Sequence, residues 1–461
     1  MSDSRYYWCA SALLHRGWAS EVLIEVDSLG NIADIRSSVA RAGLDASTTV
    51  LDGAVLPGMP NLHSHAHQRA MAGLGERAAE GDDSFWTWRK AMYHTLATIN
   101  PDQLYHIARM LYLEMLEAGY TRVAEFQYLH HDQQGNGYSN PAEMTLQCAR
   151  AAADVGIGFT ALPVLYRYGG FGGQLAGAAQ KRFINDARSF AAIVAQLKDG
   201  LAENQCLGIA PHSLRAVSAD LLNEVLAGCD QQTMVHIHIA EQIAEVEDCV
   251  AWCSQRPVEW LYHHFPVDQR WCLIHATHMT AEETRTVSAA GSIVGLCPTT
   301  EANLGDGFFN AVEYFTDQGA WGIGSDSHIS VSPVEELRWL EYGMRLNHRK
   351  RNILVDQDEH TRHTGQSLYQ RGAEGGARAC DIDAGMLKPG ARADFIALDC
   401  TQPRLYGRSQ GALLDSWIFS GNHNAVVDVV VGGEQVITAG QHRSADDIQH
   451  LYQKTIDQLA D

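Results

Sequence analysis

One stretch of the sequence decides the fold that we expect, and it runs Leu56-Pro57-Gly58-Met59-Pro60-Asn61-Leu62-His63-Ser64-His65-Ala66-His67-Gln68-Arg69. Its apolar, turn-bounded first half predicts a buried strand that ends on a His-x-His pair. Residues i and i+2 of an extended chain point the same way, so His63 and His65 can offer two imidazoles to one metal ion. Such pairs also occur as ordinary polar residues at strand ends, so the metal hypothesis depends on further ligands downstream.

Length, composition and charge exclude several classes of protein. The chain has 461 residues, 46% of them apolar, which suits a large barrel with a smaller attached domain. No run approaches the roughly 18 apolar residues of a membrane span, and residues 1–8 lack the layout of a secretory signal. A net charge of −21 disfavours nucleic-acid binding, because phosphate backbones attract basic faces. We therefore expect a cytoplasmic protein with no membrane or nucleic-acid partner, whose ten scattered cysteines are small buried hydrophobes.

Apolar strand candidates alternate with helical patterns through most of the chain. The first candidate leads into His63, and the other seven are residues 121–128, 158–165, 207–211, 233–239, 271–276, 292–297 and 321–325. Helical patterns separate most of them, for example at residues 103–118, 141–155 and 182–201. Buried strands that alternate with helices pair in parallel. Eight of them predict an α/β fold with a (β/α)₈ TIM-like barrel, whose chemistry lies at the C-terminal ends of its strands.

Two β-rich segments flank the predicted barrel of residues 56–380. Residues 1–55 show short alternating strands, and residues 381–461 contain a strand, a hairpin with a Gly-Gly turn, and a C-terminal helix. Each segment is too short to build a good core alone. We therefore expect the two segments to join in one small β-sandwich domain.

Metal-binding side chains recur at the predicted strand ends. The fifth strand ends on His238 with Glu241 three residues later, the sixth on His275, and the eighth on Asp326. Imidazole and carboxylate are usual ligands of a catalytic zinc or iron(II), which keeps one position open for water. The C-terminal ends of barrel strands share one face, so we expect these groups to lie together.

This pattern resembles the amidohydrolase superfamily, in its mononuclear deaminase branch. The resemblance implies that one divalent metal, Zn²⁺ with Fe²⁺ as the alternative, is held by His63, His65, His238 and Asp326. Binuclear members bridge two metals through a lysine at the end of strand four or strand three. The corresponding residues 209–215 and 164–167 contain no lysine.

Three further segments, residues 63–70, 85–89 and 211–215, narrow the resemblance to the formiminoglutamate deiminases of bacterial histidine degradation. The implied substrate is a small anionic amino-acid derivative, N-formimino-L-glutamate, which water converts to N-formyl-L-glutamate and ammonia. Its two carboxylates need donors, and arginine binds carboxylates in bidentate fashion. We therefore expect Arg89 and Arg215 to bind them. The resemblance adds Gln68, Tyr128 and His212 as substrate-binding groups, and it implies a homodimer.

The implied reaction gives each polar group a role. Asp326 binds the metal and accepts a hydrogen bond from the attacking water, and Glu241 moves a proton from that water to the departing nitrogen. His275 polarises the water or stabilises charge on the intermediate.

Two alternatives remain open. A nucleobase or nucleoside deaminase, or a chlorohydrolase, of the same superfamily would share the metal ligands but would need base-stacking groups in place of two arginines. A non-catalytic metal-binding protein would need neither Glu241 nor His275.

Overall fold

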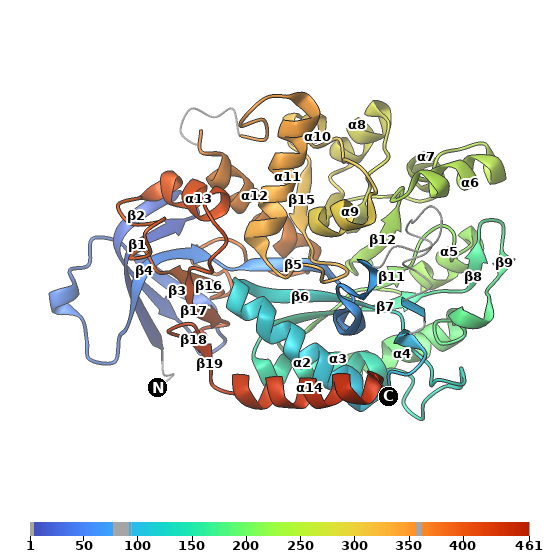
Figure 1. Ribbon diagram of the computed structural model, residues 1–461, viewed down its shortest axis with the longest axis horizontal. Coiled ribbons are helices and arrows are strands. Elements are labelled where there is room, and N and C mark those ends of the chain that lie inside the picture. Colours follow the sequence, from blue (N-terminus) through green and yellow to red (C-terminus); the bar gives the residue numbers. More distant parts are fainter. Residues whose placement is uncertain (1–3, 77–91, 94, 356–361, 461) are drawn as a thin grey trace.

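The computed structural model describes residues 4–76, 92–93, 95–355 and 362–460 (Figure 1). Its elements form a mixed α/β fold with two parallel sheets and one larger sheet built from both ends of the chain. The segment expected to form a helix from about residue 85, which carries Arg89, lies outside the described residues.

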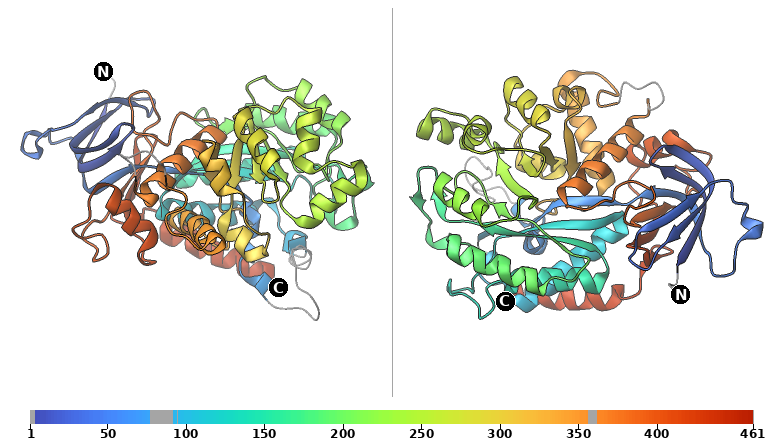
Figure 2. Two further views of the ribbon diagram at one scale, coloured as in Figure 1. Left: turned by 90° about the horizontal axis from the view of Figure 1, so that it is seen from above. Right: turned by 180° about the vertical axis from the view of Figure 1, so that it is seen from behind.

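The terminal sheet contains strands from both β-rich ends of the chain. Its eight strands lie in the order β19-β18-β17-β16-β4-β1-β2-β3. Strand β16 runs antiparallel to β4, with Phe395 opposite Pro57, and the terminal sheet occupies one end of the molecule (Figure 2). The strands are β1 (Arg5–Leu14), β2 (Gly17–Val26), β3 (Ile32–Arg36), β4 (Thr49–Pro57), β16 (Phe395–Leu398), β17 (Val426–Val431), β18 (Glu434–Thr438) and β19 (Gln441–His442).

Both faces of the terminal sheet carry apolar side chains, because successive residues of a strand point to opposite faces. On β16, Phe395 and Ala397 point to one face of the sheet and belong to a small apolar core there. Ile396 and Leu398 point to the other face and belong to the large core of the rest of the molecule. The terminal sheet is therefore packed against the parallel sheets and is not a freely tethered appendage.

Nine strands make up the two parallel sheets. The first sheet has the order β10-β7-β6-β5, with β11 also paired to β7, and the second has the order β12-β13-β14-β15. The strands are β5 (Met59–Ser64), β6 (Tyr120–Gln127), β7 (Gly158–Leu165), β10 (Cys206–Leu207), β11 (Ala210–Pro211), β12 (Val235–Ile239), β13 (Trp271–His275), β14 (Ile293–Leu296) and β15 (Ala320–Ile323).

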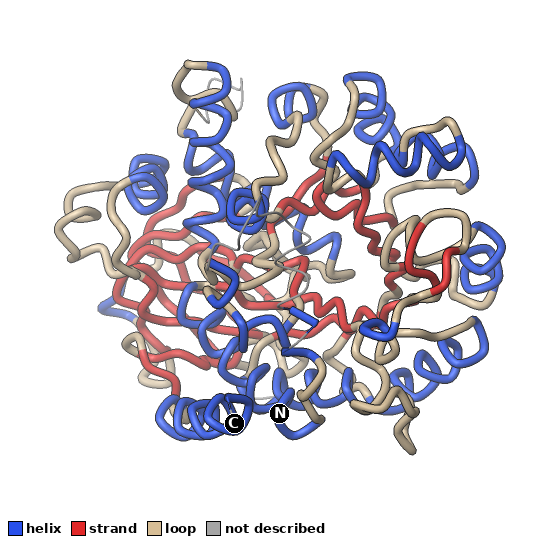
Figure 3. Tube along the Cα trace, turned by 45° about the vertical axis from the view of Figure 1, so that its right-hand side comes forward, coloured by secondary structure: helices blue, strands red, loops and turns tan. Residues whose placement is uncertain are grey.

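Isolated bridges connect the two parallel sheets at both of their edges. Ser64 at the end of β5 pairs with Asp326 after β15, while Ile209 and Ser213 pair with Val235 and His238 of β12. Helices lie along the outer side of these strands (Figure 3).

The described helices fall mostly between successive parallel strands, and none of them is both long and apolar enough to cross a bilayer. The C-terminal helix α14 packs against α2 (Figure 1). The helices are α2 (Pro101–Ala118), α3 (Glu143–Val155), α4 (Ala187–Gly200), α5 (Ala219–Ala227), α6 (Ile243–Cys253), α7 (Pro257–His264), α8 (Ala281–Ala290), α9 (Pro298–Leu304), α10 (Ala311–Thr316), α11 (Pro333–His348), α12 (Thr364–Ala379), α13 (Gln410–Phe419) and α14 (Ala445–Ala460).

Two predicted elements differ from the structure. The strand expected at residues 207–211 is split into β10 and β11, because Gly208 donates to Ala161 of β7 while Ile209 donates to Met234 on the other side. The helix expected from residue 182 begins at Ala187, since Asp186 caps it by accepting a hydrogen bond from Ser189 N. The residues before Asp186 lie in a loop.

Strand β4 leads directly into β5, and Gly58 stands at the junction. A Cβ atom at Gly58 would lie 2.3 Å from the Thr121 side chain, so only glycine fits between the two sheets here. This continuity brings the terminal sheet within a few residues of His63.

Candidate active site

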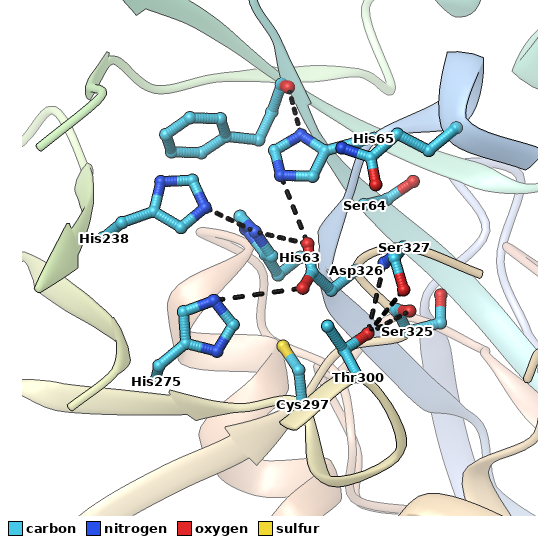
Figure 4. A network of polar contacts seen from close by, with 12 residues as sticks. His63, Ser64, His65, His238, His275, Cys297, Thr300, Ser325, Asp326 and Ser327 are labelled. Atoms are coloured by element: carbon cyan, nitrogen blue, oxygen red, sulfur yellow. Dashed lines mark hydrogen bonds and ion pairs between the residues drawn. The ribbon is translucent and has the colours of Figure 1, made fainter. Parts of the chain in front are cut away.

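Four predicted metal ligands converge at the carboxyl ends of the parallel strands. His63 lies on β5, His65 follows it, His238 lies on β12, and Asp326 follows β15. Asp326 is held beside β5 because its backbone N–H donates to His63 O and its carbonyl accepts from His65 N. Figure 4 shows the three imidazoles directed toward the Asp326 carboxylate, and one ligand atom from each of the four residues lies within 4.8 Å of the others.

The tautomers of two histidines suit metal binding. Nδ1 of His65 donates to Phe126 O at 2.9 Å, and Nδ1 of His238 donates to His212 O at 3.0 Å. A carbonyl oxygen can only accept, so in the neutral rings the proton lies on Nδ1 and Nε2 keeps its lone pair. Burial lowers the pKa of His238 well below its usual range and that of His63 to about 3, which favours the neutral form that binds metals.

The atoms that face one another in the cluster fit a bound cation. Nε2 of His63 lies 3.1 Å from Nε2 of His238, and Nε2 of His65 lies 3.2 Å from Oδ1 of Asp326. Nitrogen and oxygen lone pairs that face one another at such distances repel unless a cation lies between them. Three imidazoles and a carboxylate are a common ligand set for zinc and iron(II).

His275 and Glu241 lie next to this cluster. Nε2 of His275 is 3.9 Å from both Oε1 of Glu241 and Oδ2 of Asp326. Burial alone would lower the pKa of His275, but the Glu241, Glu301 and Asp326 carboxylates raise it to about 10. Burial raises the pKa of Glu241, although His275 and Arg215 partly offset that effect. A cationic imidazole beside a carboxyl of raised pKa suits proton transfer near neutral pH.

Backbone strain is concentrated at these strand ends. Ala240, His275 and Asp326 have φ values of 50°, 65° and 47°, in the left-handed region that non-glycine residues seldom adopt. Glu245 stabilises the backbone at Ala240, because its carboxylate accepts hydrogen bonds from the backbone N–H groups of Ala240 and Glu241 at 3.2 Å. The surrounding structure thus fixes conformations that would otherwise relax, as is common at functional sites.

A cavity beside the cluster contains the predicted substrate-binding groups that the structure describes. Gln68 donates to the Tyr128 hydroxyl at 3.1 Å. Arg215 is half-buried; burial would lower its pKa, but the nearby Glu245 and Glu241 carboxylates raise it. Arg89 lies outside the described residues. The cavity is lined by His65, Gln68, Met92, Tyr93, Tyr128, Tyr166, Phe183, His212, Arg215, His238, Glu241, His275, Leu304 and Asp326.

Several residues near the site were missed by the sequence analysis. Tyr166 follows β7 directly, so a search for polar side chains at strand ends, which identified His275, would also have identified Tyr166. Tyr93 and Leu304 line the cavity from helical segments, where no sequence signal marks them. Glu125 and Glu301 are single buried carboxylates with no motif around them.

Glu125 of β6 supports the turn that carries the metal ligands of β5. Its carboxylate accepts from Ser64 Oγ at 2.7 Å and from Ala66 N at 2.6 Å, on either side of His65. Tyr112 OH donates to the same carboxylate at 3.1 Å. Burial raises the pKa of Glu125 to about 7. The short helix η2 (Ala66–Met71) therefore begins on a buried side-chain acceptor.

Comparisons with known sequences identify the family of this chain. The profile of the Amidohydrolase family matches residues 54–436. A formimidoylglutamate deiminase of Pseudomonas aeruginosa is 48% identical over 98% of either chain. A 5-methylthioadenosine/S-adenosylhomocysteine deaminase of Pyrococcus abyssi is 23% identical over 93% of this chain and 92% of its own.

Solved structures show the same fold. The crystal structure of an amidohydrolase from Brucella melitensis superposes with a TM-score of 0.92 at 45% identity, covering 99% of this chain and 100% of the other. An adenosine deaminase from Xanthomonas campestris, solved with bound zinc, shares the fold at 21% identity with a TM-score of 0.80, covering 99% of this chain and 98% of its own. From the family profile and these relatives, we conclude that the chain belongs to the amidohydrolase family.

Proposed function

We propose that this protein is a formimidoylglutamate deiminase, which hydrolyses N-formimino-L-glutamate to N-formyl-L-glutamate and ammonia. The observation that carries the proposal is the cavity in which Arg215, a cation suited to a carboxylate, lies with the metal-ligand cluster and Glu241. The 48% identity to the Pseudomonas aeruginosa enzyme over nearly the full length supports the same substrate.

We propose one divalent metal per chain, zinc in preference to iron(II), bound by His63, His65, His238 and Asp326. A metal in this ligand set supplies a water activated for attack near neutral pH. Metal analysis of the purified protein tests the stoichiometry, and two equivalents per chain would contradict the proposal.

The remaining polar groups account for the proton movements of the reaction. Asp326 accepts a hydrogen bond from the attacking water, and Glu241 takes a proton from it as the new C–O bond forms at the formimino carbon. Glu241 then delivers that proton to the nitrogen, so that the C–N bond breaks and ammonia leaves. The remaining hydroxyl proton is released to solvent as the carbonyl group of N-formyl-L-glutamate forms. His275 donates a hydrogen bond from Nε2 and stabilises the charge that develops on the intermediate between the two proton transfers of Glu241.

Substrate recognition is proposed to rest on two arginines. Arg215 and Arg89 would bind the two carboxylates, and Gln68, Tyr128 and His212 would add hydrogen bonds. The amidinium end of the substrate is a cation, and the carboxylates of Glu241 and Asp326 would attract it.

We further infer that the parallel strands close into a (β/α)₈ barrel and that the terminal sheet is a small β-sandwich domain. The bridges from Ser64 to Asp326 and from Ser213 to His238 support closure, because they connect the two parallel sheets at both edges. The sequence resemblance supports a homodimer, which light scattering on the purified protein tests. Cytoplasmic location stays a prediction from the sequence.

A panel of substrates tests the activity. Purified protein with its metal is assayed for ammonia release from formiminoglutamate, cytosine, guanine and adenosine. We expect formiminoglutamate to be the preferred substrate by a large factor in kcat/KM. Preference for a nucleobase or nucleoside would replace our proposal with the deaminase alternative.

A further inference from the structure

A buried carboxylate lies behind His275, on the side away from the metal-ligand cluster. Glu301 is in the first turn of α9, which follows β14, and only 6% of its surface is exposed. Its Oε1 accepts the backbone N–H of Cys297 at 2.9 Å and lies 3.3 Å from Nδ1 of His275. One oxygen thus joins the start of α9 to the imidazole.

The contact fixes which nitrogen of His275 faces the reaction. Because the carboxylate accepts from Nδ1–H, the ring turns its Nε2 toward Glu241 Oε1 and Asp326 Oδ2, each 3.9 Å away. The backbone of His275 is left-handed, with φ of 65°, a conformation that the surrounding contacts must hold in place. Without an acceptor behind it, the ring could rotate about χ2 and carry Nε2 away from both carboxylates.

We propose that Glu301 is the positioning residue that orients His275 for the hydrolysis, through the hydrogen bond from Nδ1 to its carboxylate. The inference rests on the proposed function, in which Nε2 of His275 stabilises developing charge. Glu301 acts through His275 and does not line the cavity. Its role is therefore in turnover and not in binding the substrate.

Two substitutions distinguish the role of Glu301 as a hydrogen-bond acceptor from the role of its negative charge. Glu301→Gln keeps a carbonyl oxygen at the position of Oε1, which can still accept from both Cys297 N and His275 Nδ1. Glu301→Leu has a similar size and removes the acceptor. We expect Glu301→Leu to lower kcat about 10–100-fold, as loss of a group that orients an active-site ligand typically does. Glu301→Gln should recover most of that loss.

A matched control tests whether a loosened α9 could explain the result. Glu336 of α11 is also buried and holds the same turn, accepting from Thr299 N at 2.9 Å and from Thr299 Oγ1 at 2.5 Å. No hydrogen bond or ion pair in the described residues connects Glu336 to His275. Glu336→Gln should leave kcat within about twofold of wild type even if it lowers the melting temperature.

The measurements are kcat, KM, bound metal, the melting temperature and the Kd of N-formyl-L-glutamate. Support is a fall in kcat for Glu301→Leu, with KM and Kd within about threefold and metal content unchanged. The inference is overturned if Glu301→Leu turns over like wild type, if it loses metal, or if Glu336→Gln loses as much kcat. The comparison uses whichever compound of the panel releases ammonia with the wild type, so the proposed function and this inference can fail separately.

Discussion

Arg215 and Glu241 are an arginine and a carboxylic acid that line the same cavity. In the proposed function Arg215 binds a carboxylate of the substrate, while Glu241 lies in the same cavity beside the metal-ligand cluster. Burial raises the pKa of Glu241, and the charges of His275 and Arg215 partly offset that rise. Substitution of either residue therefore affects the other, and metal content must accompany every kinetic comparison.

Glu241→Gln tests proton transfer most directly. The amide keeps the size and shape of the side chain but cannot carry a proton, and general acid–base groups contribute typically ~10²–10⁴-fold to rate. We expect kcat to fall by such a factor while bound metal stays at the wild-type level. Turnover within a few-fold of wild type, with metal present, would show that Glu241 is not the group that transfers the proton.

Arg215→Ala tests recognition of the substrate carboxylate. A chain with a net charge of −21 has no general attraction for an anion, so local cations must supply it. Loss of one partner of a buried charged pair costs on the order of 2–5 kcal/mol, and we expect kcat/KM to fall accordingly.

Formiminoglycine, which lacks one carboxylate, provides the control for Arg215→Ala. The variant should lose much less kcat/KM on this compound than on formiminoglutamate. Equal losses on both compounds would indicate that Arg215 supports the fold or the metal cluster and does not bind the distal carboxylate.

At the scale of single elements, β6 supports the turn that carries His65. Glu125→Leu removes the acceptor for Ser64 and Ala66, and residues that orient metal ligands typically contribute 10–100-fold to metal affinity or activity. We expect faster loss of metal to a chelator, measured as the rate of zinc release. Glu114→Gln is the control, because Glu114 holds the same short helix from outside by pairing with Arg69. Equal release rates for wild type and Glu125→Leu would contradict this role.

The elements themselves were largely predictable, and the reasons are local. The strands that carry His63, His238 and His275 are short apolar runs that end at chemically distinctive residues, so both their type and their ends can be read from the sequence. The break between β10 and β11 could not be predicted, because it depends on Gly208 and Ile209 donating to different neighbouring strands.

The supporting carboxylates could not be predicted for a related reason. Glu125 lies inside an apolar strand and Glu301 inside a short helix, and each acts on a residue that is distant in the sequence. Only the folded chain brings Glu125 to the turn at His65 and Glu301 to His275. By contrast, the family resemblance led us to expect Gln68, Tyr128 and His212 at the cavity, and for Arg215 its place in the loop after the fourth predicted strand added to that expectation. All four line the cavity.

At the scale of the whole molecule, one apolar core spans the terminal sheet and the parallel sheets. Ile396 and Leu398 of β16 belong to the same cluster as Leu62 of β5 and Phe126 of β6. Shared cores couple the stability of the parts, so we expect a single thermal unfolding transition.

Ile396→Ala tests that coupling. Deleting a fully buried isoleucine to alanine costs about 2–5 kcal/mol, and Ile396 is 0% exposed. The whole transition should move to lower temperature in calorimetry. Two separated transitions, with only one of them moved by Ile396→Ala, would show that the terminal sheet unfolds independently.

The pairing of β4 with β16 also affects how the protein is made. Chains leave the ribosome N-terminus first, at about 5–20 residues per second, so β4 emerges long before residues 395–398. In the folded protein β4 lies between β1 and β16, so before residues 395–398 emerge only the β1 side of β4 has its partner strand. The other edge then offers unpaired N–H and C=O groups to any neighbouring strand. Nascent chains thus expose an unpaired strand edge, which can associate with other chains, for most of their synthesis. Slower translation initiation or a cooler culture, which spaces these chains apart, should therefore raise the soluble yield of the recombinant protein.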